Sequence, residues 1–168
     1  MLPTYYKYWG KASRGFADDE ICHLLPYHCL DVAAVGQILA DRLGVSKHIA
    51  EKLKCQEKNI VPIIVFLCAV HDIGKFSDGF QNQIPELARS LRGKGLHAAY
   101  QEKHWSLGHR FWREYAGRVF SSDQNTILDH LDAWFSASSG HHGRPPSNAI
   151  NAYFDTRIFP VDDAIDFI

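Results

Sequence analysis

Apolar residues recur at helical spacing over most of the chain. An amphipathic helix is predicted over residues 28–44, where Gly44 is a natural stop. Its apolar stripe consists of Val32, Val35, Ile38 or Leu39, and Leu43. A second amphipathic stretch covers residues 47–58. Residues 61–72 are nearly all apolar with Pro62 in the first turn, and they predict a central buried helix.

The second half of the chain repeats the helical pattern, at residues 104–119 and 125–136. Residues 77–103 are polar and predict a loop with a short helix at 85–91. Residues 1–20, which include Gly15 and "DDE", predict an arm, and residues 138–148 predict a loop. The tail from residue 149 is compatible with a last helix that has no clear cap. Since no alternating strand pattern occurs, we expect an all-α, compact multi-helix fold.

Length and composition place the chain among ordinary globular domains. It has 168 residues, 46% of them hydrophobic and 22% charged, which suits a single packed domain. The net charge of -1 gives no overall basic field, so any polyanion site must be local. The four cysteines lack CxxC spacing and favour a reducing cytoplasm. The longest apolar run, residues 60–70, is short for a bilayer and contains Pro62, so no membrane insertion is expected.

One ionisable pair stands at the end of the most apolar stretch. In "AVHDIGKF", His71 precedes Asp72 where the predicted buried helix ends. An isolated buried aspartate costs several kcal/mol, and a salt bridge, a raised pKa or a metal ion relieves that cost. The alternative is a helix-capping pair without further function.

Four more histidines make a metal site the stronger interpretation. "GHHG" sets His141 and His142 between glycines that allow unusual backbone geometry, although a solvated loop would look the same. His28 and His104 each begin a predicted helix, and Gly108, one turn after His104, lets a neighbour approach closely. Five imidazoles and one carboxylate are enough ligands for two metal ions.

The type of ligand limits which metal ions are expected at this site. Imidazole-rich sites suit iron, manganese, cobalt, nickel or zinc, whereas magnesium prefers oxygen. Asp72 is the only carboxylate in the set, so it is the natural bridge between two ions.

These motifs resemble the HD superfamily of metal-dependent phosphohydrolases. More narrowly, they resemble the N-terminal HD nuclease domain of the CRISPR-associated nuclease-helicase of type I interference. The resemblance covers residues 5–145 and is carried by "YWGKAS", "HLLPYHCLDVAAVG", "HDIGKFSDGFQ", "HWSLG" and "GHHG". It implies that Lys75 lies beside the metals and that the ligands are His28, His71, Asp72, His104, His141 and His142.

"KHWSLGHRFW" contains two histidines, and the pattern does not decide which of them reaches the metals. His109 would replace His104 if that helix were rotated. We favour His104 because Gly108 then falls where the family has its small residue.

The resemblance also implies a function. The expected activity is metal-dependent cleavage of single-stranded DNA, with Asp72 and Lys75 as catalytic residues. The expected partners are a helicase domain and the CRISPR surveillance complex. A solvated lysine is the alternative for Lys75.

Local features for nucleic acid are weaker. Arg89, Arg92, Lys94 and Lys103 make one loop basic, and the aromatic residues Tyr5, Tyr6, Tyr8 and Trp9 alternate with Lys7 and Lys11. The more common explanations are an aromatic arm that packs on the core and a basic loop that is simply solvated.

Two other functions stay open. The first is an HD-type phosphohydrolase acting on a mononucleotide. The second is a non-catalytic scaffold or decoy, because the family's closing aspartate in an Ala-Asp-Trp type motif does not occur before Ile168. Asp162, Asp163 and Asp166 lie in the wrong context to replace it. Residues 1–168 are therefore interpreted as an HD-type nuclease domain truncated at its C-terminal end, or as a relative that has lost the helicase region.

Overall fold

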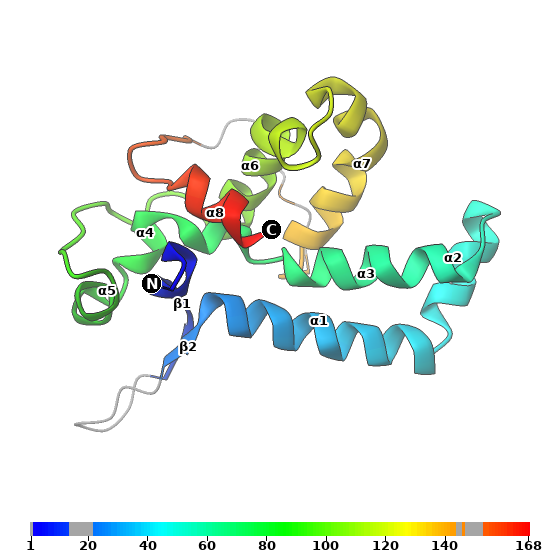
Figure 1. The fold of residues 1–168 in the computed structure, drawn as a ribbon, viewed down its shortest axis with the longest axis horizontal. Coiled ribbons are helices and arrows are strands. Elements are labelled where there is room, and N and C mark those ends of the chain that lie inside the picture. Colours follow the sequence, from blue (N-terminus) through cyan, green and yellow to red (C-terminus); the bar gives the residue numbers. More distant parts are fainter. Residues whose placement is uncertain (1, 14–21, 144–145, 147–152) are drawn as a thin grey trace.

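Helices dominate the computed structural model, which describes residues 2–13, 22–143, 146 and 153–168 (Figure 1). The elements in chain order are η1 (Thr4–Lys7), β1 (Trp9–Ala12), β2 (Cys22–Leu24), α1 (Leu25–Arg42), α2 (Val45–Leu53), η2 (Glu57–Asn59), α3 (Ile60–Ala69), η3 (Ile73–Phe76), α4 (Asp78–Gln81), α5 (Pro85–Arg92), α6 (His104–Val119), α7 (Gln124–Ser139) and α8 (Val161–Phe167). The η elements are 3-10 helices. The predicted all-α class is confirmed.

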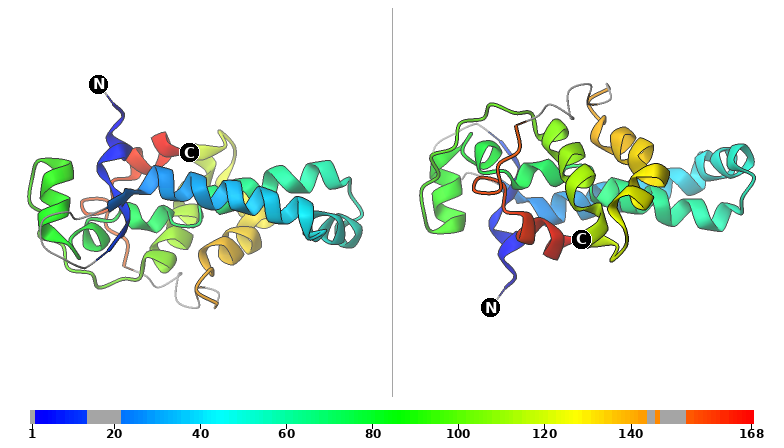
Figure 2. Two further views of the ribbon diagram at one scale, coloured as in Figure 1. Left: turned by 90° about the horizontal axis from the view of Figure 1, so that it is seen from below. Right: turned by 90° about the horizontal axis from the view of Figure 1, so that it is seen from above.

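Helices α1 and α3 lie side by side, and α2 joins them at one end of the molecule (Figures 1 and 2). Their contact depends on small side chains, because Cys29, Ala33 and Ala40 of α1 are buried. A Cβ atom on Gly36 would lie only 2.7 Å from Sγ of Cys68 in α3. The helices therefore pack too closely for larger residues between them.

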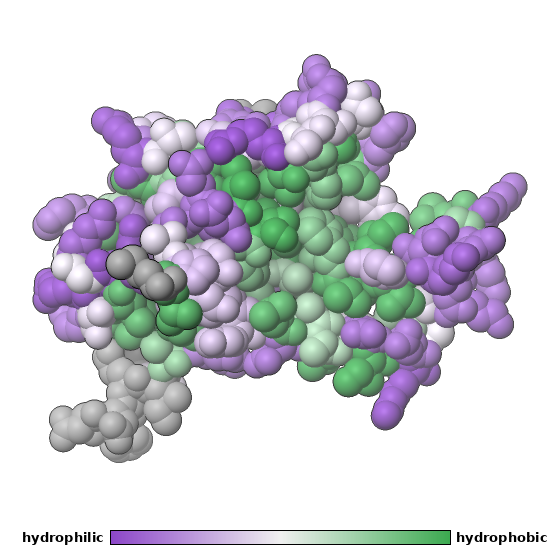
Figure 3. All heavy atoms as spheres, in the orientation of Figure 1, coloured by the Kyte–Doolittle hydropathy of each residue, from purple (hydrophilic) through white to green (hydrophobic). Residues whose placement is uncertain are grey.

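Most of the apolar stripe predicted over residues 28–44 does not pack into the core. Val35, Ile38, Leu39 and Leu43 are between 47% and 68% exposed. Since the small residues occupy the side toward α3, the large ones are left facing outward. Figure 3 shows a broad hydrophobic area over α1 and α3 on this side of the molecule.

The main core lies where α6 packs on α7, η3 and α8. Trp112 of α6 and Phe135 of α7 stack with ring centroids 4.3 Å apart and planes 4° apart. Phe76, Phe111 and Phe159 are also fully buried in this core. A last helix, α8, is present, whereas the end of the predicted 138–148 loop and the start of the tail, at 144–145 and 147–152, lie outside the described residues.

Two helix ends differ from the prediction. The central helix stops at Ala69, and the chain then turns through Val70 into η3, where the N–H of Lys75 donates to the carbonyl of Asp72 at 2.8 Å. His71 and Asp72 therefore follow the helix instead of ending it. Helix α2 stops at Leu53 and not at residue 58, because Lys54 adopts a left-handed φ of 53°.

A short hairpin also departs from the expectation of no strands. β1 pairs antiparallel with β2, with Trp9 opposite Leu24 and Lys11 opposite His23. Trp9 and Tyr8 are buried, which confirms that the aromatic arm packs on the core. The "DDE" stretch and Gly15 lie outside the described residues.

Helical segment Glu57–Phe76 is long and apolar enough to cross a membrane, by length and composition, with a mean hydropathy of 1.6. The core helix of a soluble domain passes the same test. In this fold the segment is divided among η2, α3 and η3, and it contains the charged pair Asp72 and Lys75. The absence of membrane insertion stays a prediction.

Candidate metal centre

The turn after α3 carries Asp72 into the middle of a ring of imidazoles. Asp72 is 1% exposed. Its Oδ2 atom lies 3.0 Å from Nε2 of His28 and 3.1 Å from Nε2 of His71. Its Oδ1 atom lies 3.4 Å from Nε2 of both His104 and His141. One buried carboxylate thus faces four imidazoles from four segments of the chain.

Helix ends bring these segments together. His28 lies in the first turn of α1, His104 is the first residue of α6, and His141 and His142 follow Gly140, the C-cap residue of α7. The Nε2 atoms of His142 and His104 are 3.1 Å apart. The donors form two groups, each with its ligand atoms within 4.8 Å of one another: His28, His71 and Asp72, and His104, His141 and His142.

A contact between two glycines sets the spacing of η3 and α6. A Cβ atom on Gly74 would lie 1.8 Å from the carbonyl oxygen of His104 and 2.7 Å from the backbone nitrogen of Gly108. A Cβ on Gly108 would lie 3.3 Å from the nitrogen of Gly74. The predicted close approach at Gly108 is confirmed, and it places His104 beside Asp72.

Hydrogen bonds on the outer side of the rings indicate their tautomers. Nδ1 of His71 lies 2.7 Å from the carbonyl oxygen of Cys68, and Nδ1 of His141 lies 3.1 Å from that of Ser138. A carbonyl oxygen only accepts, so each Nδ1 carries a hydrogen, and a neutral ring then turns the lone pair of Nε2 toward Asp72. Two lone pairs face one another across each short contact, an arrangement that a cation between them stabilises.

The charge state of the carboxylate agrees with a cation site. Oδ1 of Asp72 is buried and makes no hydrogen bond of good geometry within the part of the chain that the structure describes. Burial tends to raise the pKa of Asp72, but hydrogen bonds that the surrounding rings donate from Nε2–H when they are protonated outweigh it and hold that pKa well below its ordinary value of 3.8. Burial also lowers the pKa of His104, despite the nearby carboxylate. The set therefore offers an ionised carboxylate and neutral imidazoles, which fits a divalent transition metal.

Lys75 lies inside this arrangement. Its Nζ atom is 2.7 Å from Oδ2 of Asp72 and donates to the carbonyl of Gly10 at 2.8 Å. Its side chain is 12% exposed, so the alternative of a solvated lysine is wrong. The ammonium group offsets part of the charge on Asp72 and ties η3 to β1.

Gln81 stabilises the same region, where β1 meets η3, and the sequence pattern did not indicate this role. Its amide nitrogen donates to the carbonyls of Trp9 and Lys75, both at 2.9 Å, and its oxygen accepts the Trp9 N–H at 3.1 Å. The clue available in the sequence was the "FQ" that ends the HD motif, but nothing in the pattern gave this glutamine a partner.

His109 points elsewhere. Its Nε2 atom lies 3.0 Å from Oδ1 of Asp132 in α7, and Arg113 binds both oxygens of the same carboxylate at 3.1 Å. The structure therefore places His104, and not His109, in the cluster. That any of these six residues binds a metal stays a prediction.

Comparison with known proteins decides the family. The chain matches the family described as "Cas3, HD domain" over residues 9–159. It belongs to the Cas3 HD-domain family. The CRISPR-associated endonuclease/helicase Cas3 of Escherichia coli (strain K12) is 32% identical over 162 residues, which cover 85% of this chain and 18% of that protein. The resemblance noted from the motifs is confirmed.

A solved structure agrees with this assignment. The Cas3 HD domain described above superposes on a structure titled "Crystal structure of CRISPR-associated protein" with a TM-score of 0.67 and 25% identity. The match covers 97% of this chain and 18% of the solved chain. The chain thus spans less than a fifth of the length of both relatives.

The cluster of this Cas3 HD domain is open on one side. The side chain of His141 is 27% exposed and that of His28 is 19% exposed, whereas that of Asp72 is 2% exposed. Trp105 packs against His142 with ring centroids 4.6 Å apart, and Nζ of Lys103 lies 5.9 Å from the centre of the Trp105 ring. An aromatic face and a cation therefore flank the opening.

Three of the basic and acidic residues considered in the sequence have structural partners instead. Arg92 pairs with Asp78 and lies 4.8 Å over the ring of Tyr8. Asp163 accepts a hydrogen bond from the hydroxyl of Tyr8, and Asp162 pairs with Arg118 at 2.9 Å. Asp162 and Asp163 are thus engaged by other side chains, in agreement with the view that they do not replace the family's closing aspartate.

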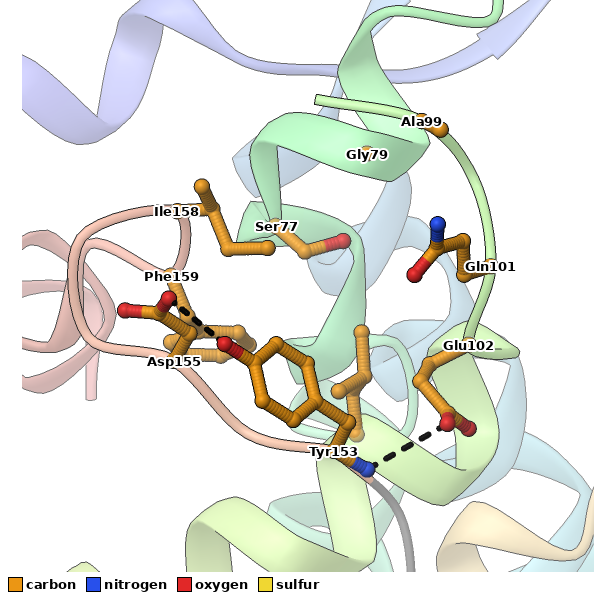
Figure 4. Close-up of a pocket in the computed structure, with 10 residues that line it drawn as sticks. Ser77, Gly79, Ala99, Gln101, Glu102, Tyr153, Asp155, Ile158 and Phe159 are labelled. Carbon is orange, nitrogen blue, oxygen red and sulfur yellow. Dashed lines mark hydrogen bonds between the residues drawn. The ribbon is translucent and has the colours of Figure 1, made fainter.

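A separate small cavity lies beside α4 (Figure 4). Its volume is about 30 Å³, which is room for one water molecule. Tyr153 closes it, because its backbone N–H donates to Glu102 at 3.2 Å and its hydroxyl donates to Asp155 at 3.0 Å (Figure 4). This cavity is too small for a nucleoside.

Proposed function

We propose that this Cas3 HD domain is a metal-dependent nuclease that hydrolyses phosphodiester bonds of single-stranded DNA in CRISPR type I interference. The observation that carries the proposal is a cluster of five imidazoles around one buried carboxylate, Asp72, whose oxygens four of them face. The implied cofactors are one or two ions of iron, manganese, nickel, cobalt or zinc.

Bound ions, Asp72 and Lys75 would each have a different role in the reaction. When bound here, divalent ions lower the pKa of a coordinated water and offset negative charge on the attacked phosphate. Asp72 contributes the charge shared by the two groups of donors, since its two oxygens face different histidines. Lys75 keeps a fixed positive charge beside Asp72, where it attracts a phosphate and limits repulsion between phosphate and carboxylate.

The opening of the cluster supports a single-stranded substrate. Asp72 is more deeply buried than His141, so a substrate has to enter the opening to reach it, and a flexible single strand does this more easily than a rigid duplex. Trp105 offers a ring on which a base stacks, and Lys103 offers a charge for the backbone. The E. coli relative is named as an endonuclease/helicase, and on that basis we propose a helicase domain and the CRISPR surveillance complex as partners, in the cytoplasm.

Cleavage assays with matched variants test the proposal. The purified chain is incubated with Mn²⁺ or Ni²⁺ and either single-stranded DNA or deoxynucleoside triphosphates. We expect cleavage of the DNA, and a loss of at least about 100-fold in Asp72→Ala, because a metal-bound transition state is stabilised by several kcal/mol. Asp166→Ala removes an exposed carboxylate from α8 and should leave the rate unchanged. Retained cleavage in Asp72→Ala contradicts the site.

The same experiment separates the alternatives. Products from the nucleotides alone would favour an HD-type nucleotide phosphohydrolase. Metal content by mass spectrometry addresses the scaffold or decoy alternative, since fewer than one ion per chain, unchanged by added metal, would support it. Circular dichroism of Asp72→Ala distinguishes loss of the site from loss of the fold.

A further inference from the structure

Three histidines of the cluster have an oxygen atom facing the outer nitrogen of the ring. For His71 and His141 this oxygen is a backbone carbonyl, which fixes the tautomer whatever the side chains are. For His104 it is the hydroxyl of Tyr100, 3.1 Å from Nδ1. Tyr100 is therefore the one side-chain partner among these three contacts, and a substitution can remove it.

Tyr100 contacts His104 at two points. Its hydroxyl oxygen also accepts the backbone N–H of His104 at 3.2 Å, at the first residue of α6. That N–H has no partner inside the helix, so Tyr100 also serves the helix start. One oxygen atom thus fixes both the backbone and the ring of the same residue.

The ring of Tyr100 is itself held in place. It meets Phe80 edge-on at 6.0 Å, and Phe80 in turn meets the ring of His104 at 5.3 Å. Nζ of Lys103 lies 5.4 Å from the centre of the Tyr100 ring. Removing only the hydroxyl would leave this packing in place, which makes phenylalanine the appropriate substitution.

We propose that Tyr100 is a positioning residue for His104, an inference that rests on the metal centre of the proposed function. In the proposed arrangement the hydroxyl oxygen accepts the Nδ1–H of His104, and the Nε2 lone pair then faces Asp72 and His142. This matches the tautomer that the carbonyls impose on His71 and His141. Partners of this kind commonly contribute 10- to 100-fold to metal affinity.

Nitrogen NMR of the metal-free chain reads the tautomer directly. With ¹⁵N-labelled histidine, and His104 assigned by its loss in His104→Gln, we expect the hydrogen of His104 on Nδ1. Tyr100→Phe should shift this ring toward the Nε2–H tautomer and weaken Zn²⁺ binding by about 10- to 100-fold. Tyr100→Phe loses two hydrogen bonds of its hydroxyl group, both with His104. Tyr153→Phe is the control for removal of a tyrosine hydroxyl away from the cluster: it loses the hydrogen bond to Asp155 and should change neither result.

The outcomes are separable. An Nε2–H tautomer in the wild-type chain, or Zn²⁺ affinity in Tyr100→Phe within twofold of the wild type, would overturn the role of Tyr100. If Tyr100→Phe does not fold, the wild-type tautomer still decides. If the wild type binds no Zn²⁺, the metal centre of the proposed function fails, while the tautomers of the metal-free wild type and variant still test Tyr100.

Discussion

Replacing Gly74 by alanine is the sharpest test of how the site is assembled. The new Cβ would lie 1.8 Å from the carbonyl oxygen of His104. Since real Cβ atoms essentially never approach other heavy atoms within 3.0 Å, η3 and α6 would have to separate by at least about 1.2 Å. The obstructing atoms belong to the backbone, so no side-chain rotation relieves the clash.

That displacement affects both stability and metal binding. Overpacking of a tight contact costs about 1–3 kcal/mol or more, and a clash with backbone belongs at the upper end of this range. His104 and Asp72 lie on the two separating elements, with Nε2 and Oδ1 now 3.4 Å apart. Metal ligands tolerate errors of only about 0.2 Å. We therefore expect Gly74→Ala to lose about 3 kcal/mol of unfolding free energy and most of its Zn²⁺ affinity.

Urea unfolding and a Zn²⁺ competition assay measure the two effects. Gly95→Ala is the matched control, because a Cβ there would meet no atom closer than 4.0 Å. It should change the unfolding free energy by less than about 1 kcal/mol, in the stabilising direction. If Gly74→Ala unfolds within about 0.5 kcal/mol of the wild type and binds Zn²⁺ equally well, the contact of Gly74 with α6 does not set the geometry of the site.

Two further predictions concern Gln81 and acid pH. Gln81→Leu should lower the unfolding free energy in urea by about 2–4 kcal/mol, because three buried backbone groups of Trp9 and Lys75 lose their partner, and a loss below about 1 kcal/mol would contradict this role. Zn²⁺ affinity should fall as the pH decreases from 7.5 to 5.5, since a protonated ring cannot bind metal, and burial, which lowers the pKa of His104, delays the loss of that ligand to the acid end of this range. Asp72 does not share in this loss, because its lowered pKa keeps it ionised throughout, so equal affinities at the two pH values would argue against histidine ligands.

The sequence predicted the cluster better than it predicted the packing. His71 and Asp72 were identifiable because a charged pair is costly next to an apolar helix, and "GHHG" because adjacent histidines between glycines are distinctive. Gly108 correctly indicated a close approach between elements. These signals lie in residue type and spacing, which one chain displays directly.

Features that depend on partners could not be found in this way. On α1 the large apolar residues suggested a core face, but α3 approaches so closely that only residues such as Ala33 and Gly36 fit between the helices. The β1 and β2 strands have no alternating pattern to reveal them, because each is at most four residues long. Tyr100 and Gln81 resemble ordinary loop and helix residues until their hydrogen bonds are known.

The donors of the cluster come from the start of α1, the turn after α3, the start of α6 and the end of α7. An ion held by them would cross-link parts of the chain that are far apart when it is unfolded, and it would bind the folded form almost exclusively. By mass action, an ion at 1,000 times its dissociation constant adds about 4 kcal/mol to the free energy of unfolding. The concentration of free metal would then determine the resistance of this domain to thermal unfolding and proteolysis, in addition to the proposed nuclease activity.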